Sequence, residues 1–341
     1  VIIKDNTFMF KEIAGVQSSP IPVAVKVDGF YTGVQISQNY INTSLSNSST
    51  SGVPAIQFEC GVTDSFITDN VIKGSGTDGG IWLTIGQADS INTEQAPCRN
   101  IKITGNQINC VGLGIFAEMC KSTTIKDNTV YTAGSGITLN VINVNVFPWA
   151  ADPNAAYFRA NWASSAYPEN CIISGNEVES TDVSNGSISG INVKGRNVTV
   201  SDNDILNAYT GIKLNDPSVE TVQLNYIVKG NRVVGDVYGL IAYGTITGLN
   251  ISNNSFKYGA QNGIRKAPDT VTEFIILGNT LEGTGIPIAI DGGCDKGLIN
   301  ANVCTSGASV SIAVNNSNCT NTQIASNVID VDDKDFWNKV Q

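Results

Sequence analysis

The segment Ile101-Lys102-Ile103-Thr104-Gly105-Asn106 decides how this chain folds. Its apolar residues alternate with polar ones and are followed by a glycine and an asparagine, which is typical of a short strand that ends in a tight turn. The same arrangement returns along nearly the whole chain, with an asparagine in its last position. Twelve asparagines occupy that position: Asn6, Asn39, Asn70, Asn106, Asn128, Asn176, Asn203, Asn231, Asn254, Asn279, Asn302 and Asn327.

A second recurring element lies between these segments and begins with a glycine followed by isoleucine or leucine. Gly80-Ile81-Trp82-Leu83-Thr84 is one example, and it alternates with a two-residue period. Successive asparagines of the first element are 22 to 48 residues apart. A period of this length built from short strands predicts a solenoid, in which each coil gains a core by stacking on its neighbours. The sequence therefore predicts one all-β architecture in place of the two domains that 341 residues would suggest.

The recurring asparagines fall at equivalent turns of successive coils, which are about 4.8 Å apart. An amide in such a turn can donate a hydrogen bond to the next coil and accept one from the previous coil, so that buried backbone groups are satisfied. The general preference of asparagine for turns would account for one such residue, but not for twelve in register. We therefore expect a ladder of stacked asparagine side chains.

On these repeats the chain resembles the right-handed parallel β-helix proteins, the pectate-lyase-like superfamily of polysaccharide lyases, glycoside hydrolases and bacteriophage tailspikes. The resemblance covers residues 1 to about 330 and implies a single-stranded β-helix of about 11–12 coils. It is most like a bacteriophage tailspike or polysaccharide depolymerase. This fold is shared by many activities, so it does not by itself select a reaction.

The repeat pattern also sets the expected domain organisation. We expect the β-helix at residues 1–329, with a long loop insertion at 141–169 and a short C-terminal cap at 330–341. Because the chain begins inside the strand pattern, we expect an N-terminal cap or domain before Val1. The eight cysteines have no metal-site spacing. Cys304 falls at an inward position, and Cys294 and Cys319 fall in equivalent turns, where they either form a disulfide or remain separate thiols.

Composition excludes several classes of chemistry. The chain has no histidine, which removes Ser-His-Asp and Cys-His nucleophiles and histidine-ligated zinc. Its net charge of −10 argues against nucleic acid as a partner. No apolar run approaches the roughly 18 residues of a transmembrane helix, so no membrane insertion is expected. The composition leaves catalysis to carboxylates, lysine, arginine, tyrosine or a hard metal ion, and we expect no cofactor and no metal.

The second recurring element predicts a surface for substrate binding. With its apolar residues inward, two columns of side chains face outward along the coils. We expect Ala24 beside Gln57 in the first column and Lys26 beside Glu59 in the second. Because Lys266 would point inward, we also expect a bulge near Arg265. Trp82 and Phe116 are neighbours in one column, where exposed aromatic rings offer sugars an apolar platform. Polar side chains beside them supply hydrogen bonds to hydroxyl groups. The expected binding residues are Trp82, Thr84, Phe116, Thr138, Asn140, Asn192, Lys194 and Lys213, with Trp149 and Trp162 from the insertion.

Carboxylates near the same columns are the candidate catalytic groups. Glu59 and Glu118 share a column two coils apart, which places their backbones roughly 9–10 Å from each other. Carboxyl groups about 6.5–9.5 Å apart suit an inverting glycosidase, in which one acid protonates the leaving oxygen and the other activates water. Two solvated glutamates on a strand face are the alternative interpretation. We expect Glu118 to be the general acid or base, with Glu59, Asp78 or Asp152 as its partner.

Three functions remain open on the sequence. The first is a tailspike-like endoglycosidase that hydrolyses a bacterial surface polysaccharide, capsule or O-antigen. The second is a polysaccharide lyase in which Lys194 or Lys213 is the base and Arg265 the acid. The third is a glycan-binding adhesin or receptor-binding spike without catalysis. The resemblance to tailspikes further implies a homotrimer for host attachment, located on the virion (the phage tail) or outside the cell, in which the insertion packs on a neighbouring subunit or borders the site.

Overall fold

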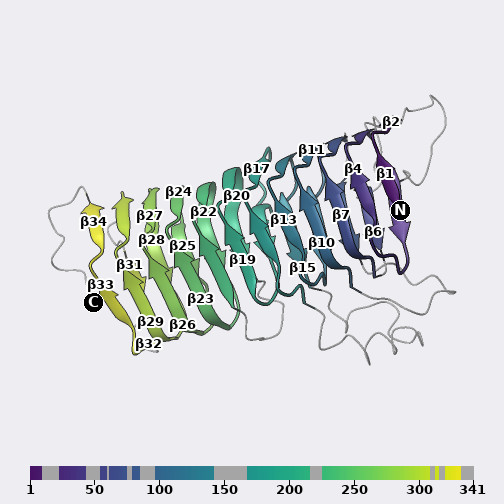
Figure 1. The fold of residues 1–341 in the computed structure, drawn as a ribbon. Helices are drawn as coiled ribbons and strands as arrows, with labels where there is room; N and C mark the ends of the chain where they lie inside the picture. The colour runs from purple at the N-terminus through teal and green to yellow at the C-terminus, as the bar shows by residue number, and fades with distance from the viewer. Residues whose placement is uncertain are drawn as a thin grey trace, which may run out of the picture. The chain divides into compact units, whose positions relative to one another are not determined.

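The computed structural model describes residues 1–9, 23–43, 54–59, 61–74, 79–84, 97–141, 167–215, 225–307, 312–314 and 319–331. The secondary structure within these ranges consists of β-strands, with no helix. The chain divides into two compact units, residues 1–172 and 173–341. Each unit is built from parallel strands that stack in three rows, as Figure 1 shows.

The first unit contains three rows of strands, one strand of each row to a coil. The row that precedes the asparagine turns consists of β1 (Ile2–Lys4), β4 (Gln35–Ser37), β7 (Thr63–Thr68), β10 (Arg99–Thr104) and β13 (Thr124–Lys126). The row that follows these turns consists of β2 (Thr7–Met9), β5 (Tyr40–Asn42), β8 (Val71–Lys73), β11 (Gln107–Cys110) and β14 (Thr129–Thr132). The row with the Gly-Ile element consists of β3 (Val25–Asp28), β6 (Pro54–Glu59), β9 (Gly79–Thr84), β12 (Ile115–Glu118) and β15 (Ile137–Asn140).

The second unit repeats the three rows. The row before the turns consists of β16 (Ile172–Ser174), which begins at the unit boundary, β19 (Val198–Ser201), β21 (Tyr226–Lys229), β23 (Ile246–Ser252), β26 (Val271–Leu277), β29 (Cys294–Asn300), β32 (Cys319–Thr320) and β33 (Gln323–Ala325). The other two rows share the long strands β20 (Asp204–Leu214) and β22 (Arg232–Ala242). After the turns lie β17 (Glu177–Ser180), β24 (Ser255–Tyr258), β27 (Thr280–Gly283), β30 (Val303–Ser306) and β34 (Val328–Val331). The Gly-Ile row adds β18 (Ser189–Val193), β25 (Asn262–Lys266), β28 (Ile286–Ile290) and β31 (Ile312–Val314).

The predicted parallel β-helix is confirmed. All strand pairs are parallel and join equivalent residues of successive coils, as in Ile103 beside Ile67 and Ile125. The inward residue of each pair is buried, so that these three isoleucines are at most 1% exposed. Each unit therefore has a core made of columns of like side chains, and this is why an apolar-x-apolar pattern repeated once per coil is sufficient to build it.

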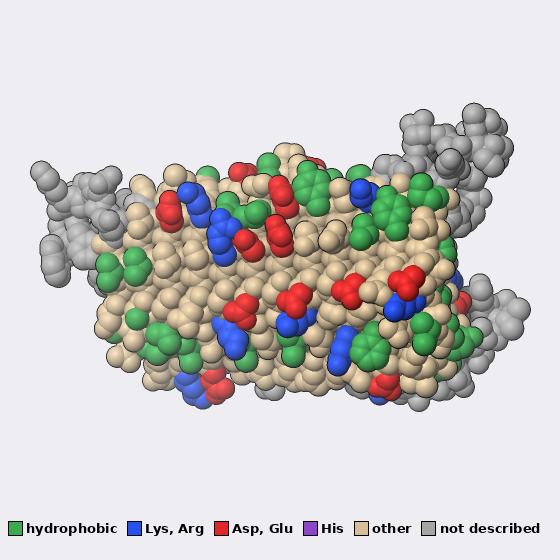
Figure 2. Space-filling view, turned by 45° about the horizontal axis from the view of Figure 1, so that its top comes forward, with side chains coloured by type: hydrophobic (Ala, Val, Ile, Leu, Met, Phe, Trp, Pro, Cys, Tyr) green, Lys and Arg blue, Asp and Glu red, His purple; other side chains and the backbone are tan. Residues whose placement is uncertain are grey.

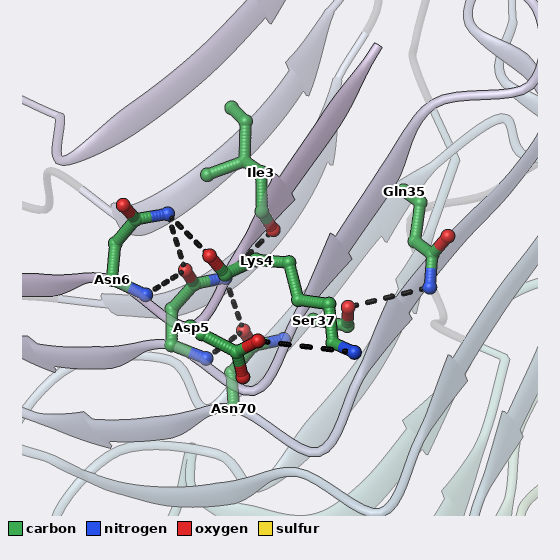
Figure 3. A network of polar contacts seen from close by, with 8 residues as sticks. Ile3, Lys4, Asp5, Asn6, Gln35, Ser37 and Asn70 are labelled. Carbon is green, nitrogen blue, oxygen red and sulfur yellow. Dashed lines mark hydrogen bonds and ion pairs between the residues drawn. The ribbon is translucent and has the colours of Figure 1, made fainter.

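The asparagine ladder is also confirmed, and it is complete within each unit. Asn70 represents the pattern: its Oδ1 accepts hydrogen bonds from the N–H and the Nδ2 of Asn39, at 3.1 and 2.9 Å. Its Nδ2 donates to Oδ1 of Asn106 at 2.9 Å and back to the carbonyl oxygen of Ile36 at 3.0 Å. Figure 3 shows the first rungs around Asn6. Within each unit, a buried ladder amide that lies between two others binds the coil on either side of it.

The residue before each ladder asparagine adopts a left-handed backbone, which the sequence pattern alone did not predict. In all twelve repeats its φ lies between 52° and 67°. Aspartate, asparagine and glycine tolerate this conformation better than other residues, and they occupy most of these positions. The residues are Asp5, Gln38, Asp69, Gly105, Asp127, Gly175, Asp202, Gly230, Asn253, Gly278, Ala301 and Ser326.

The glycine of the Gly-Ile element permits close stacking of the coils. A Cβ atom built on Gly114 would lie 2.5 Å from the carbonyl oxygen of Gly136, and one on Gly211 would lie 2.6 Å from that of Gly239. These distances are too short for any side chain. The repeated glycine therefore forms a column in which the backbone of one coil rests on that of the next.

The structure decides between the two alternatives for Cys294 and Cys319, and it confirms the expectation for Cys304. Cys294 and Cys319 form a disulfide between adjacent coils, with Cα atoms 4.3 Å apart. Cys304 is fully buried, as expected for an inward position of a strand.

Two expectations about strand register are wrong. We placed Ala24 beside Gln57 and Lys26 beside Glu59, whereas β3 is shifted by two residues, so that Lys26 lies beside Gln57 and Asp28 beside Glu59. A bulge near Arg265, expected because Lys266 would point inward, is not found: the register from Ile264 to Lys266 is continuous. Lys266 is buried without a bulge because its ammonium donates to the carbonyl oxygens of Ala267 and Asp269, at 2.8 and 2.9 Å.

The surface reflects the low content of charged residues. In Figure 2, neutral side chains and backbone cover most of one face, and acidic and basic side chains stand singly or in small groups. The described residues include no helix long and apolar enough to span a membrane. Strand β34 extends the last described coil to Val331, and the rest of the expected cap, 332–341, lies outside the described residues.

Candidate functional site

The outward residues of the Gly-Ile row in the first unit form one continuous surface. One column runs through Gln57, Trp82, Phe116 and Thr138, which are paired in register on β6, β9, β12 and β15. The second column holds Glu59 beside Thr84 and Glu118 beside Asn140. The sequence pattern thus placed these candidate residues correctly, because the alternation of the strands and their stacking fix both columns.

Trp82 and Phe116 form the aromatic pair that the sequence predicted. Their ring centroids are 5.5 Å apart and their planes are inclined by 58°. The indole lies over Gly79, where a Cβ atom would clash with Nε1. Among the described residues, neither the buried Nε1 of Trp82 nor the buried Oγ1 of Thr138 has a hydrogen-bond partner. Two polar atoms without partners on either side of Phe116 suit a site that binds hydroxyl groups.

Glu118 is the carboxyl group with the most unusual environment in this surface. Burial raises its pKa from 4.5 to about 7, and a hydrogen bond from the side chain of Asn140 opposes part of that shift. At neutral pH a substantial fraction of the group is therefore protonated. A carboxylic acid of this kind can donate a proton to a leaving oxygen, which an ordinary surface glutamate cannot do efficiently.

Glu59 has a different environment, because it forms an ion pair. Its Oε2 is 2.5 Å from Nζ of Lys26, whereas only 5% of the residue is exposed. Burial alone would lower the pKa of Lys26, but the hydrogen bond and charge of Glu59, together with Asp28, raise it. The amine is therefore a stable cation beside the carboxyl group of Glu59. One carboxyl group of the predicted pair is ion-paired and the other is partly protonated.

The two glutamates are separated by one coil. Glu59 is paired with Thr84, and the register of β9 and β12 continues from that coil to Glu118. Two coil spacings place the backbones about 9–10 Å apart. Thr84 lies between them and its Oγ1 accepts a hydrogen bond from Nε2 of Gln57 at 3.2 Å.

Four of the sequence-predicted residues lie outside the described part of the chain. They are the candidate catalytic residues Asp78 and Asp152 and the candidate binding residues Trp149 and Trp162.

The remaining candidates belong to the second unit. Asn192 and Lys213 are neighbours in register on β18 and β20, and Lys194 follows β18 directly. The ammonium of Lys213 lies 5.4 Å from the ring centroid of Tyr243. Glu118 belongs to the first unit and these basic residues to the second, so they are treated as two separate groups.

Arg265, the acid of the lyase hypothesis, borders an open groove of about 410 Å³ in the second unit. Its Nε is 2.7 Å from Oδ2 of Asp291, and its Nη1 donates to the hydroxyl of Tyr238 at 3.1 Å. Burial would lower the pKa of Arg265, but the hydrogen bond and charge of Asp291 raise it. An arginine that is bound in this way is a poor proton donor.

The sequence pattern placed Lys26 directly beside Glu59, whereas in the structure Lys26 is paired with Gln57 and its ammonium contacts Glu59 two residues further along β6. Val23, Val25 and Val27 alternate with polar or small residues, so two registers of β3 satisfy the apolar pattern equally well. Among the described residues, no group of three or more acidic or cysteine side chains is arranged to hold a metal ion.

Searches for similar proteins support the fold. No protein-family model matches the chain, and no curated protein matches it either. Among solved structures, it is similar to the A-module of mannuronan C-5 epimerase AlgE4 from Azotobacter vinelandii, with a TM-score of 0.56, 12% identity, and coverage of 89% of this chain and 84% of that chain. An exopolygalacturonase from Thermotoga maritima gives a TM-score of 0.58 at 9% identity, covering 89% and 81%.

A double mutant of the tailspike protein of E. coli bacteriophage HK620 is similar over 87% of this chain and 60% of the tailspike chain, with a TM-score of 0.56 and 10% identity. At these identities the likeness establishes the class, a parallel β-helix protein. It does not transfer a reaction.

Proposed function

We propose that this protein is a glycoside hydrolase that cleaves a polysaccharide on the surface of the first unit, with Glu118 as the general acid. The observation that carries the proposal is the buried carboxyl group of Glu118, whose pKa of about 7 suits proton donation at neutral pH. The aromatic pair of Trp82 and Phe116 lies directly beside it and supplies a platform for a sugar ring. That similar folds occur in an epimerase and an exopolygalacturonase is consistent with a polysaccharide ligand.

Glu59 is the proposed base that activates water. It forms an ion pair with Lys26, and its distance from Glu118, about two coil spacings, falls near the separation of the two acids in inverting glycosidases. The two carboxyl groups thus have different environments, since Glu59 is ion-paired and Glu118 has a raised pKa, and this difference supports the roles of base and acid. Asp78 and Asp152 remain alternative partners of Glu118.

The lyase hypothesis is the second candidate and has weaker support. It requires Arg265 to give up a proton, but the ion pair with Asp291 stabilises the charged guanidinium. Lys194 and Lys213 would provide the base. The raised pKa of Glu118 supports its role as the acid, whereas no observation of this kind supports Lys194 or Lys213 as the base.

The test is to incubate the protein with capsule or O-antigen polysaccharides and to follow the products. Hydrolysis creates new reducing ends, and inversion is seen in the anomer first formed. We expect Glu118→Gln to reduce kcat by about 10²–10⁴-fold while binding is kept, because the amide cannot donate the proton. The wild-type rate should fall as the pH rises above about 7. Glu177→Gln, at an exposed position of β17, is the matched control.

Three outcomes would contradict the proposal. Full activity of Glu118→Gln would remove Glu118 from the mechanism. Ultraviolet absorbance from an unsaturated uronate would identify a lyase. Binding without shortening of any chain would favour the glycan-binding spike.

The resemblance to tailspikes supports a more specific proposal about context. We propose that the substrate is a bacterial surface polysaccharide and that the protein acts as a homotrimer on a virion or outside the cell. Sedimentation of the purified protein tests the trimer directly, since a monomeric mass at micromolar concentration would contradict it.

A further inference from the structure

Two cysteine side chains face each other inside the first unit. The Sγ atoms of Cys120 and Cys171 are 3.6 Å apart, and the residues are 0% and 1% exposed. The thiol of Cys171 is also within hydrogen-bonding distance of the carbonyl oxygens of Cys120 and Glu169, at 3.6 and 3.4 Å. Their separation along the chain is 51 residues, so only the stacking of the coils brings them together.

The backbone around the two cysteines fixes this approach. Lys121 and Glu169 are joined by a parallel bridge, and the N–H of Ser122 donates to the carbonyl oxygen of Glu169 at 2.8 Å. Nζ of Lys121 adds a 3.4 Å contact with Oε2 of Glu169. A disulfide has sulfur atoms about 2.05 Å apart. The two sulfurs therefore need to approach by about 1.5 Å, which small rotations of the side chains can provide.

We propose that Cys120 and Cys171 form a second disulfide of this protein when it folds in the presence of a low-molecular-weight disulfide such as oxidised glutathione. Cys294 and Cys319 already form such a bond between adjacent coils. The oxidant that forms the first bond is sufficient for the second. Because both sulfurs are buried in the folded chain, the exchange takes place before the coils close around them.

The exchange balances with this one reactant. The thiolate of Cys171 attacks a sulfur of oxidised glutathione, which gives a mixed disulfide and releases one glutathione thiolate. The deprotonated Cys120 then attacks the sulfur of Cys171 and releases the second. The two cysteines lose two electrons and two protons, and two molecules of reduced glutathione form.

The proposed bond would tie together the two ends of the chain segment that contains the insertion at 141–169. A cross-link over so many residues restricts the unfolded chain, and this stabilises the folded state. This stabilisation does not depend on the proposed hydrolase activity. If the disulfide is not found, the proposed function is therefore unaffected.

The test maps disulfides in the full chain after it is refolded with reduced and oxidised glutathione. The sample is alkylated in denaturant without reductant and digested with trypsin. Peptides 103–121 and 160–194 contain Cys120 and Cys171, and peptide 74–99 contains Cys98. We expect a cross-linked pair of 103–121 with 160–194, together with the Cys294–Cys319 pair. Because peptide 103–121 also contains Cys110, the map is repeated with Cys110→Ser.

Two results would overturn the proposal. One is an alkylated Cys171 in molecules in which Cys294 and Cys319 are joined, since that bond shows that oxidation took place. The other is a link between peptides 74–99 and 103–121, which would make Cys98 the partner. The Cys171→Ser variant adds a readout of stability. Reduction should lower its midpoint of thermal unfolding by about 5–10 °C less than it lowers that of the wild-type protein.

Discussion

A ladder asparagine such as Asn231 stabilises the fold through its side-chain amide, which forms hydrogen bonds with the coil before it and the coil after it. The sequence was sufficient to foresee this, because chance and turn preference do not place an asparagine in register in every coil. It was not sufficient to foresee the left-handed residue before it. Asp202 and Gly230 suit that conformation, but Ala301 does not, and only the backbone angles reveal that Ala301 adopts it as well.

Asn231 offers a direct test of the ladder. Asn231→Ala removes the acceptor of the N–H and the Nδ2 of Asn203, and the donor to Oδ1 of Asn254, all of them buried. Since each buried group without a partner costs about 1–3 kcal/mol, we expect a loss of about 3–5 kcal/mol in the free energy of unfolding. Urea denaturation measures it. Asn109→Ala, at an exposed position of β11, should change stability by less than about 0.5 kcal/mol, and equal losses in the two variants would refute the ladder's role.

The strands of the Gly-Ile row show how well the alternation of apolar and polar residues predicts the position of a strand. Their alternation correctly put Trp82, Phe116 and Glu118 on the outer surface. It failed at β3, where a valine at every second residue left two registers open. The sequence also did not explain why the element begins with glycine. The reason is a contact between the backbones of adjacent coils, which a pattern of side chains cannot predict.

Gly211→Ala tests this backbone contact. The new Cβ would clash with Cγ1 of Val233 and lie 2.6 Å from the carbonyl oxygen of Gly239, so the coils must separate locally. We expect a loss of about 1–3 kcal/mol, measured by denaturant unfolding. Gly186→Ala is the matched control, because its nearest neighbour is a ring atom of Tyr209 at an ordinary 3.5 Å. If Gly211→Ala leaves the free energy of unfolding unchanged, the coils are not packed as closely as described.

The whole chain has few charged groups, and two of them are buried in ways that make stability depend on pH. Glu118 has a folded pKa of about 7 against 4.5 in its unfolded form, so the folded state binds the extra proton and loses stability as the pH rises from 4.5 to 7. Lys266 has a pKa lowered by burial from 10.5 to about 8, so stability rises as the pH increases from 8 to 10.5.

Thermal unfolding across pH checks both slopes. Glu118→Gln should flatten the difference between pH 4.5 and 7, and Lys266→Met should flatten the difference between pH 8 and 10.5. Each variant is the control for the other, because the residues belong to different units. If both variants keep the wild-type profile, then neither group titrates as its burial implies.

The candidate site was predictable to the extent that it depends on the repeat. The columns, the aromatic pair and Glu118 follow from periodicity. The environments of the carboxyl groups do not, because burial of Glu118 and the ion pair of Glu59 with Lys26 arise from neighbours in other coils. Residues in the longest insertion have no periodicity, so the sequence identified Trp149 and Trp162 by type alone.

The buried ladder also bears on how the protein ages. An asparagine side chain is lost to deamidation when the following backbone nitrogen can turn and attack its amide. A ladder asparagine has both its amide and its backbone held by neighbouring coils, so this attack is suppressed. Asn185 is exposed and followed by Gly186, and its side-chain oxygen accepts hydrogen bonds from Ser187 of its own turn, not from a neighbouring coil. Chemical damage during storage should therefore begin in the turns that face solvent and leave the column of amides intact.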